Sequence, residues 1–289
     1  MKFSIAFANV GPLAAVDGAT RFALAAEAAG FESLWTVEHV VVPAGYESEY
    51  PYDRSGKMPG SEDAPIPDPL IWLAFVAAAT TTIRLGTGIV ILPQRNPVVF
   101  AKEVATLDVM SGGRVELGVG VGWLAEEFDA IGVPFRERGA RTDDHIEAMR
   151  ALWTQDRASY TGRFTDFTDC IQRPQPANGT VPIHIGGHSD AAAKRAGRLG
   201  DGFFPGKGSH EELARLIGVM SETAAEVGRD ASAIEVTAGS AGIFGEDPIG
   251  EVHRLEDLGV SRCVIPSVLH MQDPETSLSR FGDAVIAKV

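Results

Sequence analysis

The chain has 289 residues, of which 45% are hydrophobic and 8% aromatic, so it can bury a sizeable core, and global disorder is excluded. Its 25 basic and 39 acidic residues give a net charge of −14, which argues against nucleic acid or an anionic membrane as a partner. The two cysteines, Cys170 and Cys263, lie far apart and match no metal-ligand spacing. The first apolar run is broken at Asn9, Gly11 and Pro12, and no window reaches the length of a membrane helix. We therefore expect a cytoplasmic protein without a signal peptide.

Apolar segments of strand length alternate with segments of helical periodicity along the whole chain. The predicted strands are Lys2–Ala8, Ser33–Val37, Ile83–Leu92, Arg114–Val119, Pro182–Gly186, Gly202–Pro205, Ile234–Ser240 and Arg262–Pro266. The predicted helices are Ala14–Ala29, Pro69–Thr80, Val98–Met110, Thr142–Trp153, Asp190–Leu199, Glu211–Val227, Ile249–Leu258 and the tail Pro274–Ala287. This alternation predicts an α/β fold with a parallel sheet, and eight repeats favour a single-domain (β/α)8 TIM barrel over residues 1–289. An open sheet is the alternative, but the segment after the first strand lacks its glycine spacing.

Two segments interrupt the alternation. Val40–Pro67 follows the second strand, is rich in proline, glycine, serine and tyrosine, and has the length of a lid or binding loop. Ser159–Pro176 precedes the fifth strand and reads as a short hairpin with an irregular return. We expect the first to be a lid over the barrel and the second an insertion.

Glycines repeat in the third and fourth predicted strands. They are Gly86 and Gly88 in the third strand, and Gly118, Gly120 and Gly122 before Trp123 at the end of the fourth. Repeated strand glycines usually mark a place that a ligand or another backbone approaches closely. We favour a ligand here, with barrel packing that needs small residues as the alternative.

Polar residues follow five consecutive predicted strands, at the end where a parallel barrel places its chemistry. These groups are Glu38-His39, Gln94-Arg95-Asn96, Trp123, Gly186-Gly187-His188 and Gly206-Lys207-Gly208. His39 is the candidate general acid or base, with a purely structural histidine as the alternative. Glu38 is a candidate orienting partner, although neighbours in an extended strand point to opposite faces.

A second candidate site is the helix that begins after Gly186-Gly187-His188. Its free amides and the positive end of its dipole favour a phosphate group, whereas helix capping explains Ser189 or Asp190 but not the paired glycines. Lys207 offers a cation for an anion, with a solvated loop lysine as the alternative. No HExxH, GxSxG, Walker or CxxC pattern occurs, so we predict no metal.

The chain resembles the luciferase-like monooxygenase superfamily, in particular its oxidoreductases that depend on the deazaflavin coenzyme F420. The resemblance is carried by AAEAAGFESLWTVEHVVVP, the long stretch from DPLIWLAF to ELGVGVGW, RTDDHIEAMRALW and VPIHIGGHS…AGRLGDGFFPGKG. It implies a (β/α)8 barrel. It also implies a homodimer, for which the apolar run Leu70–Ala79 is either interface or core.

The resemblance also implies roles for residues already singled out. Gly88-Ile89 matches a cis peptide bond that lies against one face of the cofactor ring, and Gly118 to Gly122 match the floor beneath it. Glu38-His39 matches the pair near the reactive ring, and Gly186-Gly187 match the cofactor phosphate region. Lys207 matches a phosphate-binding lysine of relatives that oxidise glucose 6-phosphate.

Other positions depart from those glucose 6-phosphate relatives. They carry an aspartate-histidine pair, a tryptophan five residues after the aspartate, and an acidic residue after the glycine run. This chain has Glu38, then Pro43 or its neighbour, and Trp123 at those positions, which puts a sugar-phosphate substrate in doubt. The prediction is an oxidoreductase that transfers a hydride between F420 and a small organic substrate. The alternatives are a flavin mononucleotide (FMN) monooxygenase that uses oxygen, and a non-catalytic flavin or deazaflavin carrier.

Overall fold

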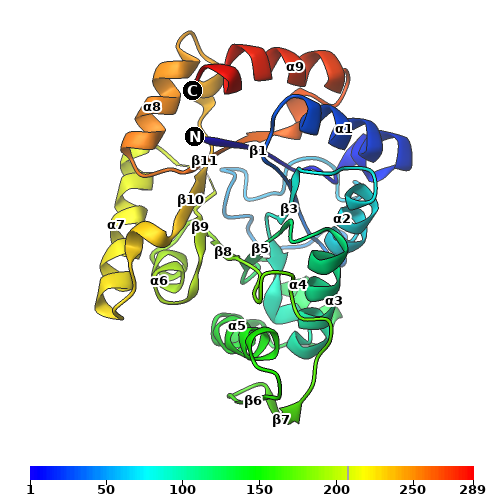
Figure 1. Ribbon diagram of the computed structural model, residues 1–289, viewed down its shortest axis with the longest axis vertical. Helices are drawn as coiled ribbons and strands as arrows, with labels where there is room; N and C mark the ends of the chain where they lie inside the picture. The colour runs from blue at the N-terminus through cyan, green and yellow to red at the C-terminus, as the bar shows by residue number, and fades with distance from the viewer. Residues whose placement is uncertain (207) are drawn as a thin grey trace.

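The computed structural model describes residues 1–206 and 208–289. Within these residues, parallel strands close into a barrel with helices outside it (Figure 1). The barrel strands are β1 (Lys2–Ala6), β2 (Ser33–Thr36), β3 (Arg84–Thr87), β4 (Val90–Ile91), β5 (Val115–Gly120), β8 (Ile183–Gly186), β9 (Gly202–Phe204), β10 (Glu235–Ala238) and β11 (Arg262–Pro266). The pairing of β3 with β5 completes the ring, and β4 continues the position of β3. The predicted eight-position parallel barrel is therefore confirmed.

The helices fall where the periodicity predicts them, with small differences at their ends. They are α1 (Val16–Ala28), α2 (Pro69–Ala77), α3 (Pro97–Met110), α4 (Ala125–Ala130), α5 (Arg138–Thr154), α6 (Asp190–Leu199), α7 (His210–Glu226), α8 (Pro248–Asp257) and α9 (Pro274–Ala284). Short polar side chains cap several of them: Asp68 accepts from the N–H groups of Leu70 and Ile71, and a proline occupies the first turn. The predicted third strand is wrong as one unit, because it breaks into β3 and β4 at Gly88–Ile89. The short helix α4 was not predicted.

Two layers of apolar side chains fill the structure. A large cluster, which includes Phe3, Leu34 and Leu85, lies between the strands and the outer helices. A small second cluster joins Trp35 and Phe204 with two smaller residues. Trp35 is fully buried, and its indole N–H donates to the Ser33 hydroxyl at 2.8 Å.

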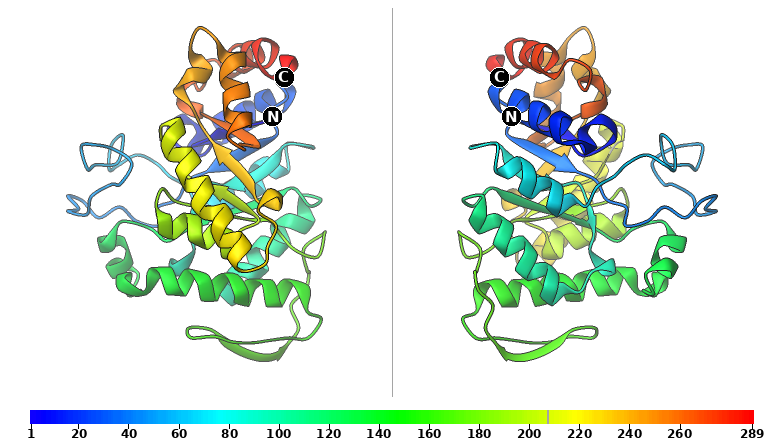
Figure 2. Two further views of the ribbon diagram at one scale, coloured as in Figure 1. Left: turned by 90° about the vertical axis from the view of Figure 1, so that its left-hand side faces the viewer. Right: turned by 90° about the vertical axis from the view of Figure 1, so that its right-hand side faces the viewer.

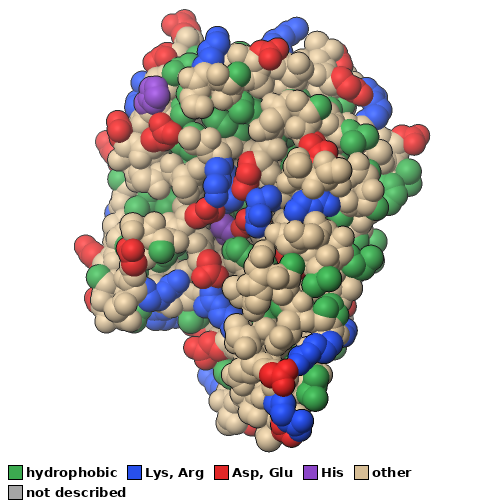
Figure 3. Space-filling view, viewed as in Figure 1, with side chains coloured by type: hydrophobic (Ala, Val, Ile, Leu, Met, Phe, Trp, Pro, Cys, Tyr) green, Lys and Arg blue, Asp and Glu red, His purple; other side chains and the backbone are tan. Residues whose placement is uncertain are grey.

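Charged side chains fill the end of the barrel at which the strands begin. Figure 3 shows acidic and basic groups gathered near the middle of that face. Arg262 is fully buried, donates to Glu32 at 2.9 and 3.0 Å, and forms an ion pair with Glu235 at 3.1 Å. Glu116 accepts from His184 Nε2 at 2.5 Å. Burial raises the pKa of Glu116, but His184 and two arginines outweigh it and hold the value at about 2. This end of the barrel is closed by ion pairs.

Two segments extend beyond the barrel. The 40–67 loop, between β2 and α2, projects from one end of the barrel (Figure 2). The predicted insertion is a hairpin of β6 (Ala158–Thr161) and β7 (Asp166–Cys170), which lies beyond α5. In residues 1–206 and 208–289, no helix is both long and apolar enough to cross a membrane.

Candidate functional site

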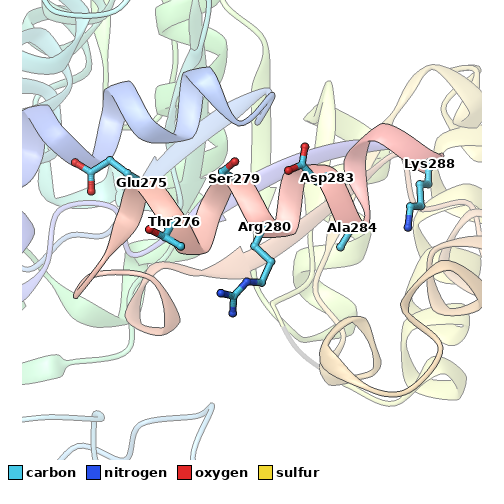
Figure 4. Close-up of a pocket in the computed structure, with 7 residues that line it drawn as sticks. All are labelled: Glu275, Thr276, Ser279, Arg280, Asp283, Ala284 and Lys288. Carbon is cyan, nitrogen blue, oxygen red and sulfur yellow. The ribbon is translucent and has the colours of Figure 1, made fainter.

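The barrel mouth, where the carboxyl ends of the strands meet, is the place to look for a site in this fold. One surface hollow lies elsewhere, along the outer face of α9 (Figure 4). All of its lining residues, Glu275 and Lys288 among them, come from α9 and the turn that follows it. A surface made by one helix has no second wall to enclose a ligand. The barrel mouth is therefore the candidate site.

His39 follows β2 at the mouth, and its imidazole is almost completely buried, with 9% of the side chain exposed. Its Nδ1 donates a hydrogen bond to Oε2 of Glu127, 3.1 Å away on α4. The other oxygen of Glu127 accepts from the backbone N–H groups of Val40, at 2.6 Å, and Val41, at 3.3 Å. Within the described residues, the Nε2 atom of His39 has no hydrogen-bond partner. The ring therefore has one nitrogen held and one available.

Glu38 does not orient His39, so that part of the prediction is wrong. One Glu38 oxygen accepts from the Arg95 guanidinium and the other from the Ile91 N–H at 2.6 Å. Asp68 holds the same guanidinium at 3.2 Å. Burial raises the pKa of Glu38, against the lowering effect of Arg95 and the Ile91 N–H. These contacts tie the end of β2 to β4, and the catalytic role predicted for Glu38 stays a prediction.

Trp123 joins His39 to the 40–67 loop. Its ring lies edge-on to His39, and edge-on to Tyr46 and Tyr50 of the loop at centroid distances of 5.4 and 5.1 Å. Burial raises the pKa of Tyr50 to about 12, so the phenol stays neutral in the cluster. Tyr52 packs on Tyr50 at 5.4 Å. The loop is thus attached to the mouth by aromatic rings.

A carboxylate on α4 fixes the same loop farther along. Glu126 accepts from the backbone N–H groups of Glu47 and Ser48 at 2.7 and 3.0 Å, and from the Ser48 hydroxyl at 2.6 Å. The Ser48 hydroxyl and these N–H groups lower the pKa of Glu126 to about 2. The adjacent residues Glu126 and Glu127 therefore bind two points of the loop.

The peptide bond between Gly88 and Ile89 is cis, as the resemblance implied. Both residues are partly exposed at the mouth. A Cβ added to Gly120 would lie 2.5 Å from Cδ1 of Ile89, and one added to Gly186 would lie 2.4 Å from its Cγ2. Gly120 and Gly186 therefore leave room for the Ile89 side chain between two strands. Contact of these four residues with a cofactor stays a prediction.

Other strand glycines leave room for neighbouring protein atoms, among them the buried Trp35 indole. A Cβ at Gly86 would lie 2.5 Å from the Trp35 indole, and one at Gly118 would lie 1.8 Å from the Thr87 carbonyl oxygen. Gly122 has a φ of +79° and faces Ile91 and Phe128. The space at these positions is taken by protein atoms. For Gly86 and Gly118 the structure favours barrel packing over the close approach of a ligand.

The predicted phosphate region is the turn into α6. Gly187 has a φ of +133°, and a Cβ there would lie 2.9 Å from Ala192 Cβ, so only glycine fits. His188 Nδ1 donates to the Pro205 carbonyl at 2.6 Å, and Ser189 caps the helix through the Ala192 N–H. Lys207, the predicted anion-binding residue, lies outside the described residues. In the chain on either side of it, no group of three or more His, Cys, Asp or Glu residues could hold a metal ion.

The luciferase-like monooxygenase family model matches residues 1–250. The chain belongs to the luciferase-like monooxygenase family. Membership makes it a luciferase-like oxidoreductase. It agrees with the barrel fold described above.

Several relatives share about a third of the sequence. Uncharacterized proteins of Mycobacterium tuberculosis and Mycobacterium bovis are 35% identical over 276 residues, which is 92% of this chain and 94% of each relative. F420-dependent glucose-6-phosphate dehydrogenases of Segniliparus rotundus and Kineococcus radiotolerans are 32% identical. The matches cover 74% and 78% of this chain, and 61% and 64% of those enzymes.

Solved structures share the fold at lower identity. The coenzyme F420-dependent tetrahydromethanopterin reductase of Methanopyrus kandleri is 19% identical, with a TM-score of 0.76 over 99% of this chain and 98% of that one. An F420-dependent secondary alcohol dehydrogenase is 20% identical, with a TM-score of 0.77 over the same shares. A monooxygenase of Streptomyces bottropensis is 23% identical, with a TM-score of 0.76 over 99% of both chains. These likenesses support the barrel fold.

Proposed function

We propose that this family member transfers a hydride between a deazaflavin of the F420 type and a small organic substrate held in the barrel mouth. The observation that carries the proposal is His39, whose Nδ1 is held by Glu127 while Nε2 has no partner among the described residues. A histidine held in this way is equipped to give or take the proton that accompanies hydride transfer. F420-dependent enzymes among the relatives and the structural neighbours support the choice of cofactor.

The residues at the mouth fit a flat ring with an anionic tail. Gly88–Ile89 offers a partly exposed, uncharged surface. This surface lies beside the end of β2, the strand that leads to His39, because the Gly88 N–H donates to the Thr36 carbonyl at 2.6 Å. The first-turn amides of α6, after Gly187, are suited to a phosphate group. The bound deazaflavin would supply the hydride chemistry.

The protein's own part is binding, orientation and proton transfer. The 40–67 loop, fixed by Trp123 and Glu126, would exclude water from the mouth as a lid. His39 Nε2 would exchange a proton with the substrate oxygen that gains or loses it. His39→Ala should lower kcat by about 100-fold without preventing cofactor binding.

A cofactor titration tests the proposal. Purified protein is mixed with F420 or with FMN, in oxidised and reduced forms, and binding is followed by fluorescence. Oxygen consumption is then measured with each reduced cofactor. We expect tight binding of F420 and no oxygen uptake. Binding of FMN with oxygen consumption would show the alternative, a flavin monooxygenase. Reduced F420 that binds but is oxidised by none of a panel of carbonyl and alkene substrates would indicate a carrier.

A further inference from the structure

Glu127 is a buried carboxylate that touches two different parts of the mouth. Its side chain is fully buried, and each of its oxygens accepts from a different partner. Oε2 accepts from the His39 ring, and Oε1 accepts from the Val40 and Val41 amides, where the 40–67 loop begins. All three donors come from three successive residues, so the contact fixes both the ring and the backbone that leads into the loop.

The chemistry of a carboxylate sets the hydrogen on the ring. An ionised carboxylate accepts hydrogen bonds and cannot donate them, so the His39 nitrogen that faces it must carry hydrogen. In the neutral ring the second nitrogen is then the basic one. Glu127 therefore selects the tautomer in which Nε2 is available for proton exchange. A glutamine at 127 would offer a donor and an acceptor and would lose this selection.

Hydrogen bonds from the backbone also fix the direction of the carboxylate. Glu127 lies in the first turn of α4. One of its oxygens accepts from the backbone amides of both Val40 and Val41. A carboxylate held by two amides has a fixed direction, and so has the ring that bonds to it.

We propose that Glu127 is a positioning residue that couples the seating of the 40–67 loop to the orientation and tautomer of His39. The proposal rests on the proposed function, in which His39 exchanges the proton. The neighbouring Glu126 provides the matched control. It holds the same loop through Glu47 and Ser48, and the described part of the chain shows no hydrogen bond or ion pair between it and His39.

The first test needs neither cofactor nor activity. Nitrogen-15 NMR of histidine-labelled protein distinguishes a protonated Nδ1 from a protonated Nε2. In the native protein and in Glu126→Gln, the His39 signals should be those of the Nδ1–H tautomer. In Glu127→Gln they should move toward a mixture of tautomers. His39 signals that are identical in Glu127→Gln and the native protein would overturn the proposal. Glu127→Asp, one methylene shorter, provides a second folded variant if the glutamine variant fails to fold.

The second test is kinetic and uses the active holoenzyme with whichever cofactor the titration identifies. Glu127→Gln should lower kcat by about 100-fold, and the loss should disappear in a His39→Ala background, because both changes remove the same function. Glu126→Gln, which loosens the same loop without removing a bond to His39, should raise KM by about fivefold and lower kcat far less than Glu127→Gln does. Equal losses for Glu127→Gln in the native and His39→Ala backgrounds would show a structural role and overturn the coupling. A protein that turns over no cofactor would contradict the proposed function, while the NMR result would still decide the role of Glu127.

Discussion

The Trp123 indole lies edge-on to the His39 imidazole, with ring centroids 5.8 Å apart and an interplanar angle of 85°. The same indole also contacts Tyr46 and Tyr50 of the 40–67 loop. The candidate acid–base residue and the loop tyrosines therefore pack against one side chain. Trp123 follows the glycine segment of β5, whereas His39 follows β2. The barrel thus brings two strand ends together through an aromatic side chain at the mouth.

Trp123→Leu should release the 40–67 loop. Each aromatic contact contributes about 0.5–1.5 kcal/mol beyond area burial, and Trp123 makes such contacts with both Tyr46 and Tyr50. Trypsin should then cleave after the exposed Arg54 or Lys57 at least about fivefold faster than in the native protein. Trp123→Phe keeps an aromatic ring and serves as the control. Equal cleavage rates in the native and leucine proteins would show that Trp123 does not hold the loop.

Gly86→Ala should destabilise the barrel, because its Cβ would lie 2.5 Å from the rigid, buried Trp35 indole. Overpacking of this kind costs about 1–3 kcal/mol in the free energy of unfolding. The control is Gly218→Ala on the exposed face of α7, where a Cβ meets nothing within 4 Å and a helix interior favours alanine. Urea unfolding should show opposite signs for the two variants. A Gly86→Ala protein as stable as native would mean that the interior accommodates the methyl group.

The fold could be predicted from the sequence, because strand length and helical periodicity are local properties. The site could be predicted only in part. His39 follows a recognisable strand, but its partner Glu127 lies 88 residues away in a six-residue helix without a strong periodic pattern. The adjacent glutamates after Trp123 are a signal that sequence reasoning left unused. The strand glycines are visible in the sequence, but the strand face that Trp35 occupies is not, so the sequence does not predict that Gly86 makes room for the Trp35 indole.

Arg95→Met should be strongly destabilising. The Arg95 guanidinium is the cation beside the buried Glu38, and removing it leaves a buried carboxylate that burial already drives toward protonation. Loss of one partner of a buried pair costs about 3–5 kcal/mol. The double variant Glu38→Gln, Arg95→Met removes both charges and should recover part of the loss. Thermal and urea unfolding measure both, and an Arg95→Met protein of native stability would show that Glu38 does not need its partner.

The outer faces of α2 and α3 expose apolar side chains, with Ile71 at 73% and Val99 at 55%. The homodimer expected from the resemblance stays a prediction, and we predict that its interface includes this surface. Ile71→Lys should convert a dimer to a monomer in analytical ultracentrifugation, because a buried lysine at an interface is costly. Val227→Lys, on the exposed end of α7, is the matched control. A native protein that sediments as a monomer would refute the dimer.

The loop before β3 is held by Glu27 of α1, and this contact predicts a pH dependence of stability. Burial alone would raise the pKa of Glu27, but the N–H groups of Thr82, Ile83 and Thr81 lower it to about 2. A carboxyl whose folded pKa lies below its unfolded value of about 4.5 stabilises the fold above that value, and the contribution is lost as pH falls toward 2. Glu27→Gln should therefore cost about 1 kcal/mol at pH 7, since the group is partly exposed, and much less near pH 2. Urea unfolding of both proteins between pH 7 and pH 2 should give curves that converge with acidification. A difference in unfolding free energy that stays constant over this range would show that the charge of Glu27 is not what holds the loop.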